Sequence, residues 1–212
     1  MSPLSWKDSL QKKIELLRQI HSCPRIALIG IGQELCGDDA VGILTARTLR
    51  KQDGLMQNLL VIDAGPAPEN FCGALRRFQP HLVIFIDAAQ MHGDPGLISY
   101  LNPHETTSMG ISTHSLPLFL FADYLTSELG CETGILGIQP ENIVFGAPLT
   151  SAVRKAVTSL LEHMTELLSS SAGRQTSVVK EGSKQHLLNT YLSQNAQAGI
   201  QNVYHNEGAH GK

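Results

Sequence analysis

Hydrophobic positions along the chain fall into two patterns, short continuous apolar runs and longer stretches with helical spacing. The continuous runs predict five strands, at residues 25–32, 59–65, 81–89, 98–100 and 133–138. The first three runs are rich in branched residues, as in strands that are buried on both faces. We expect the run at 98–100, which follows a turn signal ending in Gly96, to be an antiparallel addition to the sheet.

The stretches between these runs carry apolar residues every three or four positions, which places them on one helical face. This spacing predicts helices at residues 5–21, 39–51, 69–78, 116–129 and 150–168. Thr150 or Ser151 can cap the start of the last helix, and Gly130 suits the C-terminal cap of the helix before it. Because strands and helices alternate, the chain is predicted to form an α/β fold, a parallel-type sheet with helices on both faces.

Composition narrows the class of protein. Hydrophobic residues make up 42% of the 212 residues, which is enough for a real core. The segment 169–212 shifts to Ser, Gly, Gln and Asn, and we interpret most of it as a mobile polar tail. The net charge is -3 with no dense block of Lys or Arg, so a nucleic-acid partner is not expected. The apolar runs are also far shorter than a membrane span.

The N-terminus and the cysteines predict the compartment. The first residues are polar and charged where a secretory signal needs an apolar run, so we expect a cytoplasmic protein without membrane insertion. The four cysteines form no Cys-x-x-Cys pair. This spacing disfavours a structural zinc site or a disulfide framework and predicts reduced thiols.

The loop after the first strand carries candidate chemistry, but not that of a dinucleotide site. Leu35 occupies the third glycine position of the Gly-x-Gly-x-x-Gly fingerprint, so the pattern fails. Glu34, Asp38 and Asp39 in the same loop would repel a pyrophosphate. A nucleotide-binding function is therefore disfavoured by both pattern and charge.

Acidic residues end three of the predicted strands, at the edge where open α/β sheets bind ligands. The first strand leads to Asp38 and Asp39, the second ends at Asp63 and the third at Asp87, while His114 precedes a helix. Carboxylates and an imidazole suit nickel, zinc or related divalent ions, and three protein ligands leave positions open for water or for groups of a partner. The sequence thus predicts a divalent-metal site at this edge.

Other interpretations of these residues stay open from spacing alone. Asp38 or Asp39 could cap the following helix, the aspartates that end the other strands could form turns, and a lone histidine is more often structural or solvated. Cys36 is interpreted as a small loop residue, because the sequence places no base within its reach. Ser115 lacks the Gly-x-Ser-x-Gly surroundings of a serine hydrolase.

The order of short motifs along the chain resembles that of a known family. The motifs are Gly30-Ile-Gly32, Gly37-Asp-Asp-Ala-Val-Gly42, Ile62-Asp-Ala-Gly65, Ala67-Pro-Glu-Asn70, Ile86-Asp-Ala-Ala89, Pro95-Gly96, Ser112-Thr-His-Ser-Leu-Pro117 and Gly137-Ile-Gln-Pro140. In this order and spacing they resemble the hydrogenase maturation endopeptidases, most closely the hydrogenase-3 type. The resemblance covers residues 25–168 as an α/β maturation-protease domain. Residues 1–24 are then a helical extension, and 169–212 a tail.

The resemblance implies a fold, a reaction and a set of site residues. The family fold is a twisted, mostly parallel five-stranded sheet sandwiched by helices, a three-layer arrangement like that of phosphorylase/hydrolase folds. The implied reaction removes the C-terminal extension from a hydrogenase large-subunit precursor after nickel insertion, with no organic cofactor. Asp39, Asp87 and His114 are implied to recognise the nickel that the substrate carries, and Asp39 and Asp87 to be catalytic. Gln33 stands where the family often has asparagine.

Two mechanisms and two rival functions stay open at this point. Nickel held by both proteins could polarise the scissile carbonyl or activate water, or it could be a checkpoint only, with a water activated by Asp39 or Asp87. A non-enzymatic nickel-binding assembly factor would use the same residues, together with His205 and His210 of the tail. A general α/β hydrolase or nucleotide enzyme has only the fold in its favour.

Overall fold

The computed structural model describes residues 5–52, 55, 57–103, 112–113 and 118–169. These residues lie in one compact unit, Met1–Ser171, and residues 172–212 make up a second unit. Apart from Ser169, the predicted tail falls outside the described residues, and the domain boundaries drawn from the sequence stay predictions. Within the described ranges, no helix has the length and apolar character needed to cross a membrane.

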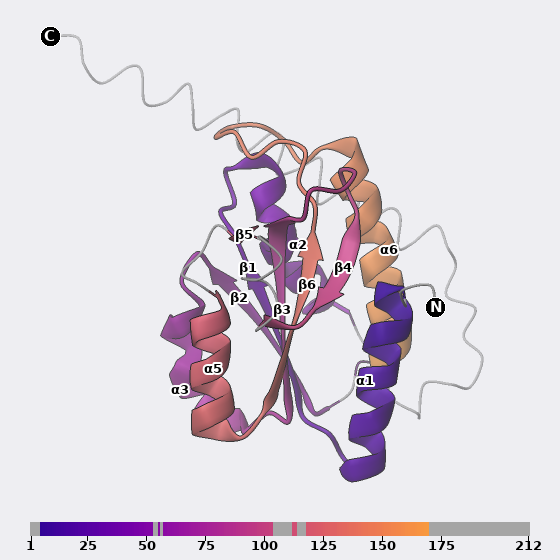
Figure 1. Cartoon of the computed structure of the whole chain (residues 1–212), viewed down its shortest axis with the longest axis vertical. Helices are drawn as coiled ribbons and strands as arrows, with labels where there is room; N and C mark the ends of the chain where they lie inside the picture. Colours follow the sequence, from indigo (N-terminus) through magenta and orange to yellow (C-terminus); the bar gives the residue numbers. More distant parts are fainter. Residues whose placement is uncertain (1–4, 53–54, 56, 104–111, 114–117, 170–212) are drawn as a thin grey trace, which may run out of the picture. The chain divides into compact units, whose positions relative to one another are not determined.

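A mixed sheet forms the centre of the first unit (Figure 1). Its main strands lie in the order β2 (Leu59–Gly65), β1 (Ile26–Ile31), β3 (Leu82–Gln90), β6 (Glu132–Ile138) and β4 (Ile98–Leu101). The first four are parallel, and β4 pairs antiparallel with β6, so the five predicted strands and the antiparallel addition are confirmed. All of β1 and nearly all of β3 are buried, which accounts for their continuous apolar runs.

The short strand β5 (Ser112–Thr113) was not among the five strands predicted from the sequence. It pairs antiparallel with Ala89 and Gln90. On either side of β3, β1 pairs only as far as Ile86 and β6 only as far as Ala88. The end of β3 therefore extends past both neighbours, and its free backbone groups are the ones that β5 uses.

Helices cover both faces of the sheet (Figure 1). One face carries α1 (Trp6–Ile20), α2 (Val41–Leu49) and α6 (Ser151–Leu168), and the other carries α3 (Cys72–Phe78) and α5 (Leu118–Leu129). The five predicted helices and the predicted three-layer α/β arrangement are thus confirmed within the described residues. A 3₁₀ turn precedes α2 and another precedes α3, namely η1 (Gly37–Ala40) and η2 (Pro68–Phe71). Thr150 caps α6 through its side chain, as predicted.

The helix α1, which lies before the region of family resemblance, packs against α6 and β4. Its buried residues are Leu10, Ile14 and Leu17. The Trp6 ring meets the His163 ring edge-on, with 5.2 Å between centroids. The Arg18 guanidinium donates a hydrogen bond of 2.8 Å to the carbonyl oxygen of Leu167. These contacts join the N-terminal helix α1 to α6, the last helix of the first unit.

Two glycines allow α2 to lie directly on the sheet, and this contact sets the position of the loop before α2. A Cβ atom on Gly42 would lie 2.0 Å from the carbonyl oxygen of Ile86 and 2.3 Å from that of Ile31. A Cβ atom on Gly30 would lie 2.2 Å from the Gly42 carbonyl oxygen. Since backbone meets backbone at this point, the start of α2 is held close to the carboxyl ends of β1 and β3.

Candidate active site

The carboxyl ends of β2, β1 and β3 lie side by side at one edge of the sheet. The carboxylates that the sequence predicts for this edge are Glu34, Asp38, Asp39, Asp63 and Asp87. They differ in their partners, and this difference decides which of them can receive a ligand, because a buried polar atom in a folded protein normally has a hydrogen-bond partner.

Arg47 of α2 pairs with two of these carboxylates. Its Nε atom donates to Oδ2 of Asp63 over 2.6 Å, and its Nη2 atom donates to Oε2 of Glu34 over 3.0 Å. A second contact joins Nη1 of Arg47 to Oε1 of Glu34. The pairing is part-exposed, so it contributes about 0–1 kcal/mol for each pair. Asp63 and Glu34 thus have a cationic partner within the protein, and we set them aside as ligands for an incoming metal.

Asp38 is fully buried and has its carboxylate filled by hydrogen bonds. Oδ2 accepts from the backbone N–H groups of Glu141 (2.9 Å) and Asn142 (3.0 Å) and from the Thr150 hydroxyl (3.0 Å). Oδ1 accepts from the Thr150 N–H over 2.7 Å. The alternative that Asp38 or Asp39 caps the following helix is wrong, because the residue at the N-cap of α2 is Ala40 and no side chain caps that end. Asp38 instead ties the η1 loop to the segment leading into α6.

Asp39 and Asp87 are buried with carboxylate oxygens that lack partners. Oδ2 of Asp39 accepts from the Gln33 N–H over 2.8 Å, but Oδ1 has no hydrogen-bond partner among the described residues. Neither oxygen of Asp87 has one in the same part of the chain. Burial raises the pKa of Asp87 well above its ordinary value and the charge of Asp39 raises it further, while the nearby Ala88 N–H, which makes no hydrogen bond of normal geometry to the carboxylate, lowers it. Asp39 therefore lies close enough to Asp87 for its charge to act on that carboxyl.

The third predicted residue, His114, lies outside the described residues. Thr113, which directly precedes it in the sequence, pairs with Ala89, two residues beyond Asp87. Within the described ranges, no group of three His, Cys, Asp or Glu side chains is placed to hold a metal ion. The structure therefore brings Asp39 and Asp87 together, and the place of His114 in the same site stays a prediction.

Gln139 is a residue at this edge whose role was missed in the sequence, where it served only as part of a family motif. Its side chain is buried, and Oε1 accepts from the N–H groups of Met91 (2.7 Å) and Gly93 (3.4 Å). Nε2 donates to the Pro140 carbonyl over 3.2 Å and also to the side chain of Gln90. Gln139 therefore anchors the segment that leaves β3 after Asp87. An amide directly after a buried strand was the available signal.

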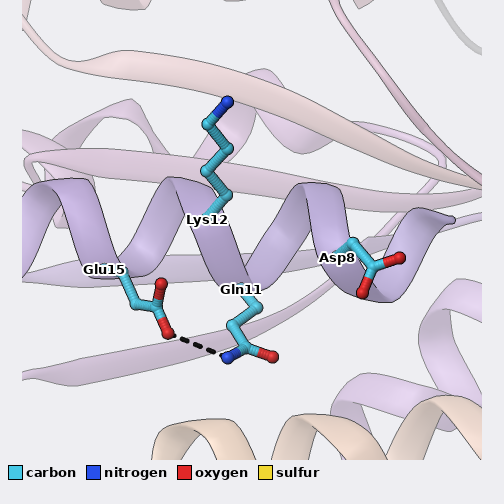
Figure 2. Close-up of a pocket in the computed structure, with 4 residues that line it drawn as sticks. All are labelled: Asp8, Gln11, Lys12 and Glu15. Carbon is cyan, nitrogen blue, oxygen red and sulfur yellow. Dashed lines mark hydrogen bonds between the residues drawn. The ribbon is translucent and has the colours of Figure 1, made fainter. Parts of the chain in front are cut away.

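A surface hollow elsewhere on the unit carries no such chemistry. Figure 2 shows that its lining side chains, Asp8, Gln11, Lys12 and Glu15, all come from α1. Gln11 donates to Glu15 within the same helix over 2.8 Å. These are solvated groups on one helical face, so the hollow does not compete with the strand edge as an active site.

Comparisons with known proteins show which family this chain resembles. The HycI model, described as hydrogenase maturation protease, matches residues 43–167, a range that includes Asp87 and begins just after Asp39. A relative from Methanocaldococcus jannaschii named for the same activity is 36% identical over 162 residues, covering 72% of this chain and 95% of the relative. The hydrogenase 3 maturation protease of Escherichia coli K12 is 33% identical over 138 residues, covering 65% of this chain and 86% of that protein.

Solved structures show the same similarity. The crystal structure of a [NiFe] hydrogenase maturation protease HycI from Thermococcus kodakarensis KOD1 superposes with a TM-score of 0.63 at 30% identity, covering 73% of this chain and 98% of that one. The solution structure of the endopeptidase HycI from Escherichia coli gives a TM-score of 0.57 at 29% identity, covering 74% and 99%.

The fold and these relatives define an endopeptidase of the α/β class. More specifically, the chain belongs to the hydrogenase maturation protease family. The predicted resemblance, including its hydrogenase-3 type, is confirmed. The assembly-factor and general-hydrolase interpretations are thereby set aside in favour of a protease.

Proposed function

We propose that this endopeptidase removes the C-terminal extension of a nickel-loaded hydrogenase large-subunit precursor, and that Asp39, Asp87 and His114 recognise the nickel. The observation that carries the proposal is the set of buried carboxylate oxygens without partners, Oδ1 of Asp39 and both oxygens of Asp87. Leaving such atoms unpaired costs free energy in the isolated protein, and a cation supplied by the substrate would satisfy them.

The chemistry of the donor set fits this role. Carboxylate oxygens and a neutral imidazole are suitable ligands for nickel, and they must be deprotonated to bind it. The other acids of this edge are occupied, Asp38 by hydrogen bonds and Asp63 by Arg47. The two acids left over are those that the family resemblance also selects. Three protein donors leave further coordination positions for groups of the precursor.

We propose that Asp39 and Asp87 also take part in the cleavage. Two mechanisms are compatible with a pair of buried acids at this edge of the sheet. In one, nickel held between the two proteins polarises the scissile carbonyl. In the other, nickel is a checkpoint and one of the two carboxylates removes a proton from the attacking water. Both require the pair of acids, and both fail without them.

The test uses purified chain with nickel-loaded and nickel-free precursor, followed by intact-mass measurement of the precursor. We expect a loss of mass only with the nickel-loaded form. Asp39→Asn, Asp87→Asn and His114→Ala should each slow cleavage by at least about 100-fold. Asp63→Asn is the matched control at the same edge and should cleave at a rate close to that of the native chain. Equal cleavage of both precursor forms would sink the nickel-recognition hypothesis.

We also propose that the protein works in the cytoplasm. Cys23, Cys36, Cys72 and Cys131 are all free thiols, as expected in a reducing compartment. Cell fractionation with an antibody to the chain would check this, and recovery of the protein in an oxidising compartment would contradict it.

A further inference from the structure

Four large apolar side chains are exposed next to the candidate active site. Leu35 follows β1, and Ile143, Val144 and Phe145 lie in the segment between β6 and α6; we call these four residues the apolar rim. Their exposed fractions are 53% for Leu35, 39% for Ile143, 65% for Val144 and 70% for Phe145. Single exposed apolar residues need no explanation, but a contiguous group beside a functional site marks an interaction surface.

Hydrogen bonds join the two segments of the apolar rim to each other. The Gly146 N–H donates to the Leu35 carbonyl oxygen over 2.7 Å. Within the second segment, the Val144 N–H donates to the Asn142 side chain over 2.9 Å, and the Ala147 N–H donates to the Val144 carbonyl over 3.1 Å. The apolar side chains are therefore presented by a turn that is held by the paired N–H groups of Val144, Gly146 and Ala147.

The same segments are attached to the loop that carries Asp39. The Asp38 N–H donates to the Asn142 carbonyl oxygen over 2.8 Å, and the Asp38 carboxylate accepts from both Glu141 and Asn142. At Gly37, which has a φ of 55°, a Cβ atom would lie 2.3 Å from the Asn142 carbonyl oxygen, so the two loops meet backbone to backbone. Buried Asp38 thus fixes the position of the apolar rim relative to Asp39, the next residue in the sequence.

We infer that the apolar rim is the docking surface for the folded body of the hydrogenase large-subunit precursor, against an apolar surface of that protein that flanks its metal. This inference rests on the proposed function. A precursor that brings a metal to Asp39 and Asp87 must cover the sheet edge next to them, and the apolar rim adjoins that edge, because Leu35 lies in the loop that carries Asp39 and Asp38 of the same loop is hydrogen-bonded to the second rim segment. Burying exposed apolar side chains supplies affinity that one metal contact and a short peptide would lack.

The position of the apolar rim separates binding from chemistry. Its side chains carry no acid, base or metal ligand, so they can stabilise the ground-state complex and the transition state equally. Such uniform binding lowers KM without changing kcat. Docking of a protein surface is also suited to selecting one precursor, because the wrong partner would leave Val144 and Phe145 in water.

The test is a double variant, Val144→Ser with Phe145→Ser, in the full chain, assayed on nickel-loaded precursor. We expect KM to rise by about tenfold or more while kcat stays within about twofold, with unchanged thermal unfolding. Binding of the same precursor, followed by biolayer interferometry, should weaken by a similar factor. Ile20→Ser on α1, which removes a side chain that is 63% exposed elsewhere, is the matched control and should change neither value.

The outcomes distinguish this inference from the proposed function. If the native chain cleaves the precursor and the double variant shows native KM and binding, the docking surface is wrong and the function stands. If the native chain binds the precursor through the apolar rim but never cleaves it, the proposed function is wrong and the surface stands. If sedimentation shows a native dimer that the double variant converts to monomer, with KM unchanged, a second copy occupies the apolar rim and the inference is overturned.

Discussion

Replacing Asp87 with asparagine should stabilise this protein while abolishing its activity. Asp87 is fully buried, and neither of its oxygens has a hydrogen-bond partner in the described part of the chain. The charge of Asp39 nearby makes ionisation of Asp87 more costly still. Asparagine has almost the same volume but no charge, so the substitution removes the charged form without opening a cavity.

The pH dependence follows from the raised pKa of Asp87. In the unfolded chain, this carboxyl ionises above its ordinary pKa of 3.8, but in the folded protein it keeps its proton to a higher pH. Between pH 3.8 and the raised pKa of Asp87 in the folded protein, the folded protein therefore binds more protons than the unfolded protein. Asp87 destabilises the fold increasingly as pH rises through this range. Below 3.8 both states are protonated and the penalty disappears.

The magnitude follows from linkage: asparagine removes a penalty that grows by about 1.4 kcal/mol for each pH unit between 3.8 and the pKa of Asp87 in the folded protein, so a gain of at least about 1 kcal/mol is expected. Asp87→Asn should gain that amount in the free energy of unfolding at pH 8, which raises Tm by about 2–4 °C for each kcal/mol in a domain of this size. The gain in stability should shrink as the pH is lowered toward 5, because ionisation of Asp87 then stabilises the unfolded chain by less.

The assay is thermal unfolding by circular dichroism at a series of pH values from 5 to 8 and constant ionic strength. Asp63→Asn provides the control, because Asp63 is paired with Arg47 and its removal offers no gain that grows with pH. An Asp87→Asn variant that unfolds below the native chain at pH 8 would refute the reasoning, since it would mean that the native carboxylate has a stabilising partner.

Three further predictions concern the structure around this edge. Asp38→Ala removes the acceptor of four hydrogen bonds and should lower the free energy of unfolding in urea by at least about 2 kcal/mol; an unchanged midpoint would contradict this. Gly42→Ala should cost more than about 3 kcal/mol, because its Cβ would lie 2.0 Å from a backbone oxygen of Ile86. Gly73→Ala on α3, with its nearest atom at 3.6 Å, should be neutral or stabilise by up to about 1 kcal/mol, so equal melting of the two variants would be inconsistent. Gln139→Ala should lose about 1–3 kcal/mol and reduce kcat, and native values of both would remove its anchoring role.

The layers of the fold were predictable because burial leaves a periodic trace in the sequence. The strand predicted at 59–65 has the same bounds as β2, since its apolar run ends at a glycine that adopts a φ of 60°. The two-residue strand β5 was not predictable, because its existence depends on unpaired groups at the end of β3, far away in the sequence. The 3₁₀ turns before α2 and α3 were not predicted either. No side chain caps the start of either turn, so the sequence carries no capping signal there.

The candidate site was only partly predictable. Strand ends identify the acidic residues, because parallel strands share an edge, but they do not tell which acid has a partner. The ion pair between Asp63 and Arg47 joins residues of β2 and α2, and the hydrogen bonds of Asp38 reach residues more than 100 positions away. Local spacing carries no record of either contact. The burial and the partners of the acids, which only the fold shows, therefore distinguish Asp39 and Asp87 from the others.

The neighbouring acids Asp38 and Asp39 show how one loop serves both stability and function. They lie in the 3₁₀ turn η1, in which successive side chains are rotated by about 120° around the axis. One acid can therefore face the segment before α6 while the next faces β3 and Asp87. The hydrogen bonds that fill Asp38 stabilise the loop, and this rigidity allows Asp39 to keep a buried oxygen without a partner. The two acids could exchange these roles only if the loop rotated about its own axis. We therefore expect that no substitution of Asp39 rescues the Asp38→Asn variant.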